Sequence, residues 1–158
     1  MANVMRWRYG DTNPIMLAVD SATVIEIGDL VYFDTDDVKP AASSTYGVSL
    51  AAAQETFHDK FAGVAMQASA AGETAPIRVA TTGVFEFVQA SATVQVGTRM
   101  GLDDNIASDA LLNQQVISVS ASNPERAIGH CARLASSATT IYVAIQSTLM
   151  NDGPQAVA

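Results

Sequence analysis

Two clusters of acidic residues, two histidines and one cysteine are the residues of this 158-residue chain that we consider first as candidates for catalysis or metal binding. Two acidic clusters carry the oxygen ligands that Ca²⁺ prefers. They are Asp34, Asp36 and Asp37, and then Asp103, Asp104 and Asp109. An EF-hand loop starting at Asp34 would need a ligand at Val38 and a glycine at Lys39, and has neither. We interpret both clusters as solvated acidic turns, with a calcium site of another kind as the alternative.

The histidines and the cysteine do not form a recognised catalytic or zinc pattern. His58 and His130 are not spaced with further ligands as zinc sites require, and His130 and Cys131 would point to opposite faces of a strand. Cys131 has no second cysteine to pair with, so we expect a small buried side chain. There is no G-x-S-x-G elbow, P-loop or dinucleotide glycine pattern. We therefore predict that the protein is not an enzyme and uses no cofactor.

The amino-acid composition limits the kinds of molecule that we expect the protein to bind. Eight basic against sixteen acidic residues give a net charge of −8, which disfavours binding to nucleic acid or to an anionic membrane. Only 15% of the residues are charged, against about 25% in a typical soluble domain. A surface covered largely by small uncharged residues suits contact with further copies or with a partner. A weakly charged monomer is the alternative.

The pattern of apolar residues has a period of two along most of the chain, which is typical of strands. The alternating or continuous apolar runs cover residues 25–27, 30–33, 77–79, 84–88, 94–96, 116–120 and 140–146. One segment differs, because an apolar face with helical spacing follows a possible N-cap at Ser49. Its residues are Leu50, Ala53, Phe57 and Phe61. The sequence predicts an all-β protein, a small β-barrel or β-sandwich of about 8–10 short strands, with one short helix and an N-terminal arm.

We divide the chain into an arm (1–14), a single β domain (15–150) and a C-terminal tail (151–158). A weak internal repeat suggests two half-repeats, 24–88 and 93–147. Residues 25–29 match 94–98 at an offset of 69. At an offset of 66, Gly63 pairs with Gly129, and further pairs follow: Ala65 with Cys131, Thr74 with Thr140, Ile77 with Val143, and Val79 with Ile145. Chance similarity between alternating strands is the competing interpretation.

The arm contains the candidate partner-binding residues, which are Arg6, Trp7, Arg8 and Tyr9. Arginine and tryptophan are enriched in the residues that dominate protein interfaces, and Trp7 is the one tryptophan of the chain. A basic and aromatic segment on an acidic domain indicates attachment to another molecule. An ordinary first strand with Trp7 buried is the alternative.

Several short motifs follow one another between roughly residues 20 and 105. They are I-E-I-G-D-L-V-Y-F-D (25–34), F-A-G-V-A (61–65), A-G-E-T (71–74), G-V-F-E-F (83–87) and V-G (96–97). In this order they resemble the capsid decoration, or cement, proteins of tailed bacteriophages. The resemblance implies a structural virion protein on the outer capsid surface, without catalytic residues, metal or cofactor.

The implied partners are the major capsid protein and the chain itself, as a homotrimer at three-fold positions. Its implied role is to stabilise contacts between major capsid subunits of the expanded head. An alternative from another class is a glycan-binding β-sandwich that serves as a virion adhesion or tail accessory module.

Overall fold

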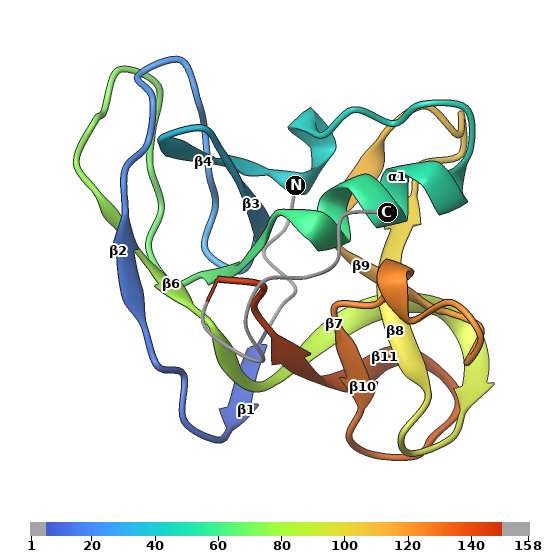
Figure 1. Cartoon of the computed structure of the whole chain (residues 1–158). Coiled ribbons are helices and arrows are strands. Elements are labelled where there is room, and N and C mark those ends of the chain that lie inside the picture. The colour runs from blue at the N-terminus through green and yellow to red at the C-terminus, as the bar shows by residue number, and fades with distance from the viewer. Residues whose placement is uncertain (1–5, 150–158) are drawn as a thin grey trace.

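The computed structural model describes residues 6–149, and it is an all-β protein built from two sheets and one α-helix (Figure 1). The predicted tail 151–158 and the first five residues of the predicted arm lie outside the described residues. The strands are β1 (Arg6–Tyr9), β2 (Ile15–Leu17), β3 (Leu30–Asp34), β4 (Asp37–Pro40), β5 (Phe61–Ala65), β6 (Ile77–Ala80), β7 (Thr82–Val94), β8 (Arg99–Asp104), β9 (Leu111–Ser118), β10 (Gly129–Cys131) and β11 (Ala135–Gln146).

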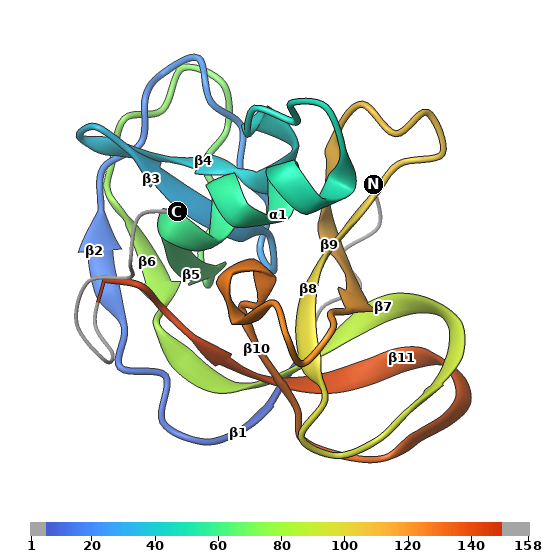
Figure 2. The same ribbon diagram turned by 45° about the vertical axis from the view of Figure 1, so that its right-hand side comes forward.

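The second half of the chain forms a closed barrel of five strands. Its strand order is β7-β11-β10-β8-β9, and the barrel closes where β9 pairs with β7 in parallel, Val88 opposite Gln115. β1 adds to the remaining edge of β7. In Figure 2 the barrel lies at the lower right and β2, of the other sheet, at the far left. The prediction of a small β-barrel is confirmed.

Strands β2 to β6, which we call the first half, have the same arrangement as the five strands of the barrel. The sheet of the first half has the order β2-β6-β5-β3-β4, which is the same sequence of first, fifth, fourth, second and third strand as in the barrel. The two outer strands also meet, because the Val38 N–H donates to the Ala18 carbonyl at 2.9 Å. This bond lies at the position of the β7–β9 contact.

The turns that precede β3 and β8 have the same hydrogen bonds. Gly28 N–H donates to Ala65 at 2.8 Å, and Gly97 N–H donates to Cys131 at 2.8 Å. In return, the backbone N–H of Ala65 and that of Cys131 donate to Asp29 and Thr98, at 2.9 and 2.8 Å. Both glycines have positive φ (98° and 85°), which glycine adopts without a steric penalty. The halves, residues 15–80 and 82–146, are therefore an internal structural repeat. The predicted bounds 24–88 and 93–147 were wrong, because they left out β2 and put part of β7 in the first half.

Strand pairing fixes how the halves align. Val31 lies opposite Gly63 and Met100 opposite Gly129, which agrees with the sequence offsets of 69 and 66. The last strands differ, since the sequence match placed Ile77 and Val79 against Val143 and Ile145. Ala65 pairs with Val79, whereas Cys131 pairs with Val143. Here the offset is 64, two residues less, so the sequence comparison had the wrong register for this strand.

Each half encloses its own apolar interior. Val31, Ala62 and Ala65 belong to the core of the first half, and their counterparts Met100, Ile128 and Cys131 to the core of the barrel. The first interior is thus filled by smaller side chains. β5 is buried along its whole length, because Phe61 and Val64 face the other half while Ala62 and Ala65 face inward.

The predicted helix forms as α1 (Leu50–Asp59) and joins the halves. It ends before Phe61, which the helical spacing had included and which begins β5. The Ser49 hydroxyl accepts a hydrogen bond from Ala52 N–H, as an N-cap does. Phe57 is fully buried, with its ring 5.8 Å from that of Tyr32, and Gln54 donates to the Leu102 carbonyl in β8 at 2.7 Å.

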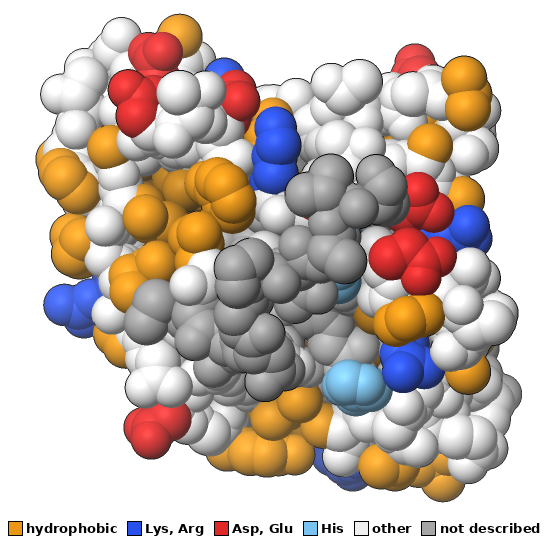
Figure 3. Space-filling view, viewed as in Figure 1, with side chains coloured by type: hydrophobic (Ala, Val, Ile, Leu, Met, Phe, Trp, Pro, Cys, Tyr) orange, Lys and Arg blue, Asp and Glu red, His pale blue; other side chains and the backbone are white. Residues whose placement is uncertain are grey.

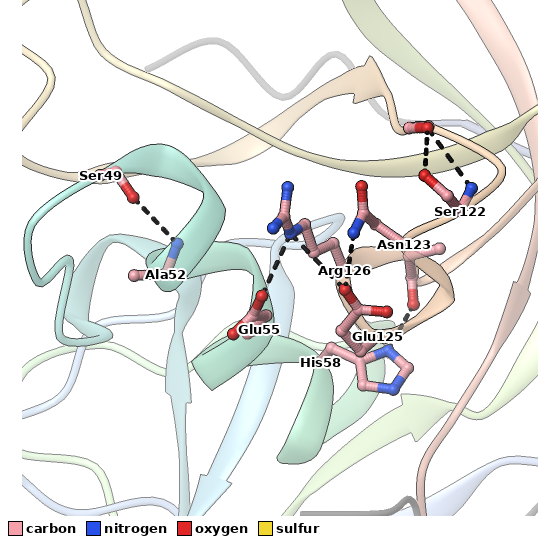
Figure 4. A network of polar contacts seen from close by, with 10 residues as sticks. Ser49, Ala52, Glu55, His58, Ser122, Asn123, Glu125 and Arg126 are labelled. Carbon is pink, nitrogen blue, oxygen red and sulfur yellow. Dashed lines mark hydrogen bonds and ion pairs between the residues drawn. The ribbon is translucent and has the colours of Figure 1, made fainter. Parts of the chain in front are cut away.

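A short 3₁₀ helix, η2 (Pro124–Arg126), packs beside α1. Arg126 bonds Glu55 at 3.2 Å, and the ring of His58 bonds the Ala127 carbonyl at 2.6 Å (Figure 4). A second 3₁₀ helix, η1 (Ala41–Ser43), follows β4.

Three local expectations differ from the structure. In the predicted strand 94–96, only Val94 lies in a strand, at the end of β7, and residues 96–97 form a turn. Residues 25–27 are not a strand, because Ile25 makes only an isolated bridge to Ser69 and Glu26–Asp29 is a turn. The described residues contain eleven strands, more than the 8–10 that we predicted. The difference arises because β1, β2 and β10 are too short to give a clear alternation in the sequence. In the part of the chain from 6 to 149, no helix has the length and apolar character to cross a membrane.

A buried polar pair connects the two halves. Gln114 of β9 donates to the Asp29 carboxylate at 2.9 Å, and both side chains are almost fully buried. Glu26 N–H donates to the other carboxylate oxygen at 2.9 Å. Burial raises the pKa of Asp29 above its ordinary value, and the bond from Gln114 partly offsets this effect.

We predict that Gly63→Ala and Gly129→Ala each lower the free energy of unfolding by about 3 kcal/mol or more. A Cβ at Gly63 would lie 1.9 Å from the Ala80 carbonyl oxygen, and one at Gly129 would lie 2.1 Å from that of Ala144. Gly72→Ala is the control, because Gly72 also has positive φ but nothing lies within 4 Å of the added carbon. It should cost only about 1–2 kcal/mol. Urea denaturation measures all three, and equal losses would contradict the close approach.

We predict that Gln114→Leu lowers the free energy of unfolding by about 2–3 kcal/mol at pH 7, because it leaves the ionised Asp29 without its partner in the core. Gln114 stabilises the ionised carboxylate. The folded pKa of Asp29 is raised, so acidification protonates Asp29 in the folded state first and relieves the penalty. The difference between variant and wild type should therefore shrink as the pH falls. Gln95→Leu, at an exposed position, is the control.

Candidate partner-binding site

The predicted binding residues form β1, an edge strand of the barrel sheet. Arg6 lies opposite Glu86 and Trp7 opposite Phe85, and the register shifts before Tyr9, which lies opposite Val84. The described part of the predicted arm therefore pairs with the domain as a short strand.

All four β1 residues are exposed. Trp7 is 53% exposed and Tyr9 is 50% exposed, so Trp7 is not the buried core residue of the alternative interpretation. The Trp7 indole donates to the Gly10 carbonyl at 3.2 Å, which holds the ring close to the strand. Large aromatic side chains held in this way lose little further conformational entropy when a partner binds.

The arginines of β1 meet residues from distant parts of the chain. Arg8 forms an ion pair with Glu86 of β7, and its guanidinium carbon lies 5.4 Å from the centre of the Tyr142 ring in β11. Arg133, just after β10, lies 5.3 Å from the same ring. Both distances suit cation–π contacts. The hydrogen bond to Glu86 raises the pKa of Arg8, and the same bond lowers the pKa of Glu86, so both groups stay charged near neutral pH.

A shallow cavity of about 230 Å³ lies over β11 beside this cluster. Arg133 and Tyr142 line it together with Glu86, Leu134 and Ser136. We call Arg6, Trp7, Arg8, Tyr9, Glu86, Arg133 and Tyr142 the arginine–aromatic patch. It contains three of the eight basic residues of the chain and one acid, so it is a locally positive region on a protein of net charge −8. On the face in Figure 3, charged side chains form several small groups between uncharged and hydrophobic ones.

The first half has the same framework without this patch. The strand registers align Glu86 with Met16, and Tyr142 with Arg78. Folding of the scaffold therefore does not require the stacked arginines.

The acidic clusters have partners within the protein. Asp34 pairs with Lys39 at 2.6 Å, which lowers the pKa of Asp34. Asp103 accepts from Gln115 at 2.8 Å, Asp104 accepts from the Tyr46 hydroxyl, and Asp109 accepts from Asn105 at 2.7 Å. Among residues 6–149, no three His, Cys, Asp or Glu side chains gather in a way that could hold a metal ion.

His58 and His130 line one shallow cavity of about 250 Å³, together with Arg99 and Gln146, and Cys131 does not line it. Cys131 is buried, with its Sγ 3.0 Å from the Arg133 carbonyl, and burial raises the pKa of its thiol. His130 is exposed on the opposite face of β10, as the alternation predicted.

Sequence reasoning missed the other half of the patch, which is Glu86, Arg133 and Tyr142. These residues lie far from β1 in the sequence, and no local motif connects them with it. Only the pairing of β1 with β7 and of β7 with β11 brings them together.

No protein-family model matches this chain, and no curated protein matches it either.

We predict that iodide quenches the fluorescence of Trp7 about twofold more efficiently than caesium does, although the protein is acidic. Trp7 is exposed beside Arg6 and Arg8, whose field concentrates anions. Since Trp7 is the one tryptophan of the chain, the whole signal reports on β1. Arg6→Gln with Arg8→Gln should remove the preference, and acrylamide, which is neutral, controls for exposure. Preferential quenching by caesium would contradict the positive field.

Proposed function

We propose that this chain is a structural virion protein, a decoration or cement protein that binds the outer surface of an expanded phage head and stabilises contacts between major capsid subunits. The proposal includes self-association as a homotrimer and no catalytic activity or cofactor. Its strongest support is the arginine–aromatic patch, an exposed group of residue types that dominate interfaces, on a protein in which 15% of the residues are charged.

The motifs of the resemblance occupy positions consistent with this proposal. Residues 25–34 form β3 and the turn before it in the first half, 61–65 form the fully buried β5, and 83–87 form the part of β7 that carries β1. They thus include both the framework of the repeat and the support of the patch.

The mechanism that we propose is binding linkage. A protein that binds only the expanded lattice stabilises it by mass action. Trimeric attachment multiplies modest single contacts through effective concentration. Trp7 and Tyr9 would contribute buried area, and the three arginines would orient the chain against acidic groups of the shell.

One observation favours the alternative proposal that the protein binds glycans. Trp7 and Tyr9 are both exposed and lie two residues apart, and sugar sites use exposed aromatic rings. A glycan array separates the two proposals, because a cement protein gives no hits on it.

The decisive measurement is the molar ratio of this chain to the most abundant shell protein in purified particles, by quantitative mass spectrometry. We expect a ratio near one, since a cement protein covers the whole shell. A ratio of a few per cent would favour a vertex or tail module, and absence from particles would reject both proposals.

We predict that Trp7→Ala weakens binding to expanded heads roughly thirtyfold, the effect of losing an interface hot spot. Ile106→Ser is the matched control, because Ile106 is fully exposed on the β8–β9 loop, away from the patch. A point substitution is preferable to deleting residues 1–14, since the Thr12 carbonyl accepts bonds from Thr81 and Thr82 and the deletion would disturb the fold. Equal affinity of Trp7→Ala and wild type in a sedimentation assay would exclude the patch as the binding surface.

A further inference from the structure

The two halves differ at the outer edge of their first strand: β1 covers this edge in the second half, and no described strand covers it in the first half. β7 is the first strand of the barrel, and β1 covers its edge at Glu86. The counterpart of β7 is β2, and the strand registers place Met16 where Glu86 stands. β2 pairs only with β6 in its sheet and forms the outer boundary of the molecule in both ribbon views (Figures 1 and 2).

The hydrogen bonds of β6 show which way the backbone of Met16 faces. Arg78 accepts from Met66 N–H and donates to the Gln67 side chain, both at 2.8 Å and both on the side of β5. In an antiparallel ladder, the neighbouring residues then face the other way. Ile77 and Val79 therefore bond to β2, and the N–H and C=O of Met16 point away from the sheet.

In the barrel, the corresponding strand edge is covered by β1. Tyr142 accepts from Ala132 N–H at 2.8 Å on the side of β10, so the backbone of Glu86 faces away from β11. There it meets Arg6 of β1. Two residues further along β2 and β7, the two halves have equivalent neighbours again. The Ala18 carbonyl accepts a hydrogen bond from Val38 of β4, and Val88 pairs with Gln115 of β9. Among the described residues, the edge at Met16 is thus the one place where the repeat lacks the added strand.

We propose that the edge of β2 at Met16 takes up an extended segment of the shell protein as an added antiparallel strand, with an acidic side chain against Arg78. The identity of the partner rests on the proposed function; the site itself does not. Strand addition to an open edge is an established mode of recognition in which backbone bonds give affinity and side chains give specificity.

The side chains around the edge define the chemistry of the occupant. In the barrel, Arg8 of the added strand touches Glu86 and Tyr142. The equivalent residue of a partner would touch Met16, which is 57% exposed, and Arg78. The guanidinium of Arg78 forms no ion pair with residues 6–149. An acidic residue fits this place, whereas β1 of a second copy would bring Arg8 against Arg78 and be repelled.

The first test uses two capped synthetic peptides, Val-Trp-Glu-Tyr-Gly and its matched control Val-Trp-Arg-Tyr-Gly, with amide exchange followed by NMR. In the free protein, the Met16 amide should exchange rapidly and the Glu86 amide slowly. The glutamate peptide should slow exchange at Met16 and bind roughly fivefold more tightly than the arginine peptide. Arg78→Glu should reverse this order. No protection of Met16 by either peptide, or an unchanged order in Arg78→Glu, would overturn the proposal.

The second test uses the whole chain and expanded heads. Met16→Pro removes the outward N–H without removing a bond to β6, and Met16→Leu keeps the N–H as the control. Met16→Pro should reduce binding to heads at least tenfold, and Met16→Leu should not. If Met16→Pro does not fold, Arg78→Glu replaces it.

The outcomes separate this inference from the proposed function. Normal binding of Met16→Pro to heads overturns the strand addition and leaves the cement function standing. Absence of the chain from particles, together with both peptide effects, overturns the cement function and the shell partner but keeps the strand site. An oligomer that Met16→Pro converts to monomers would assign the edge to a second copy and overturn the partner proposed here.

Discussion

Two glycines set how closely the strands of each half can approach. Gly63 and Gly129 lie against the backbone carbonyls of Ala80 and Ala144, where no other residue has room for its Cβ. This contact brings the fourth and fifth strands of each half into register, and the turns at Gly28 and Gly97 then hydrogen-bond to the fourth strand. Both small interiors depend on this close packing, because a wider spacing would leave them unfilled.

The halves share a framework but differ in what they present. The barrel has larger interior side chains, an added strand and the arginine–aromatic patch. The first half has smaller interior side chains, and no strand of the described part of the chain covers its edge at Met16. α1 and the Asp29–Gln114 pair hold the halves together. Under the proposed function, the two unlike surfaces on one repeated scaffold would let one chain contact two neighbours.

Much of the framework could be predicted from local sequence. Ser49 and the spacing of Leu50, Ala53 and Phe57 located α1, because capping and amphipathic periodicity act within a few residues. The offset of 69 between residues 25–29 and 94–98 located equivalent turns, since positive φ requires glycine at Gly28 and Gly97. The offset for the last strand was wrong by two residues, because alternating apolar side chains match equally well at any even shift.

By itself, the sequence determined the all-β class, the single helix and the unusual basic and aromatic segment at residues 6–9, and it indicated a repeat without giving its bounds. These features follow from periodicity, glycine positions and composition, which are local properties. Only the tertiary structure decided that β1 lies on β7, that Arg8 and Arg133 flank Tyr142, and that no strand within residues 6–149 pairs with the outer edge of β2 at Met16. Each of these depends on which strands pair. Pairing is set by contacts between residues far apart in the chain, and no single segment contains that information.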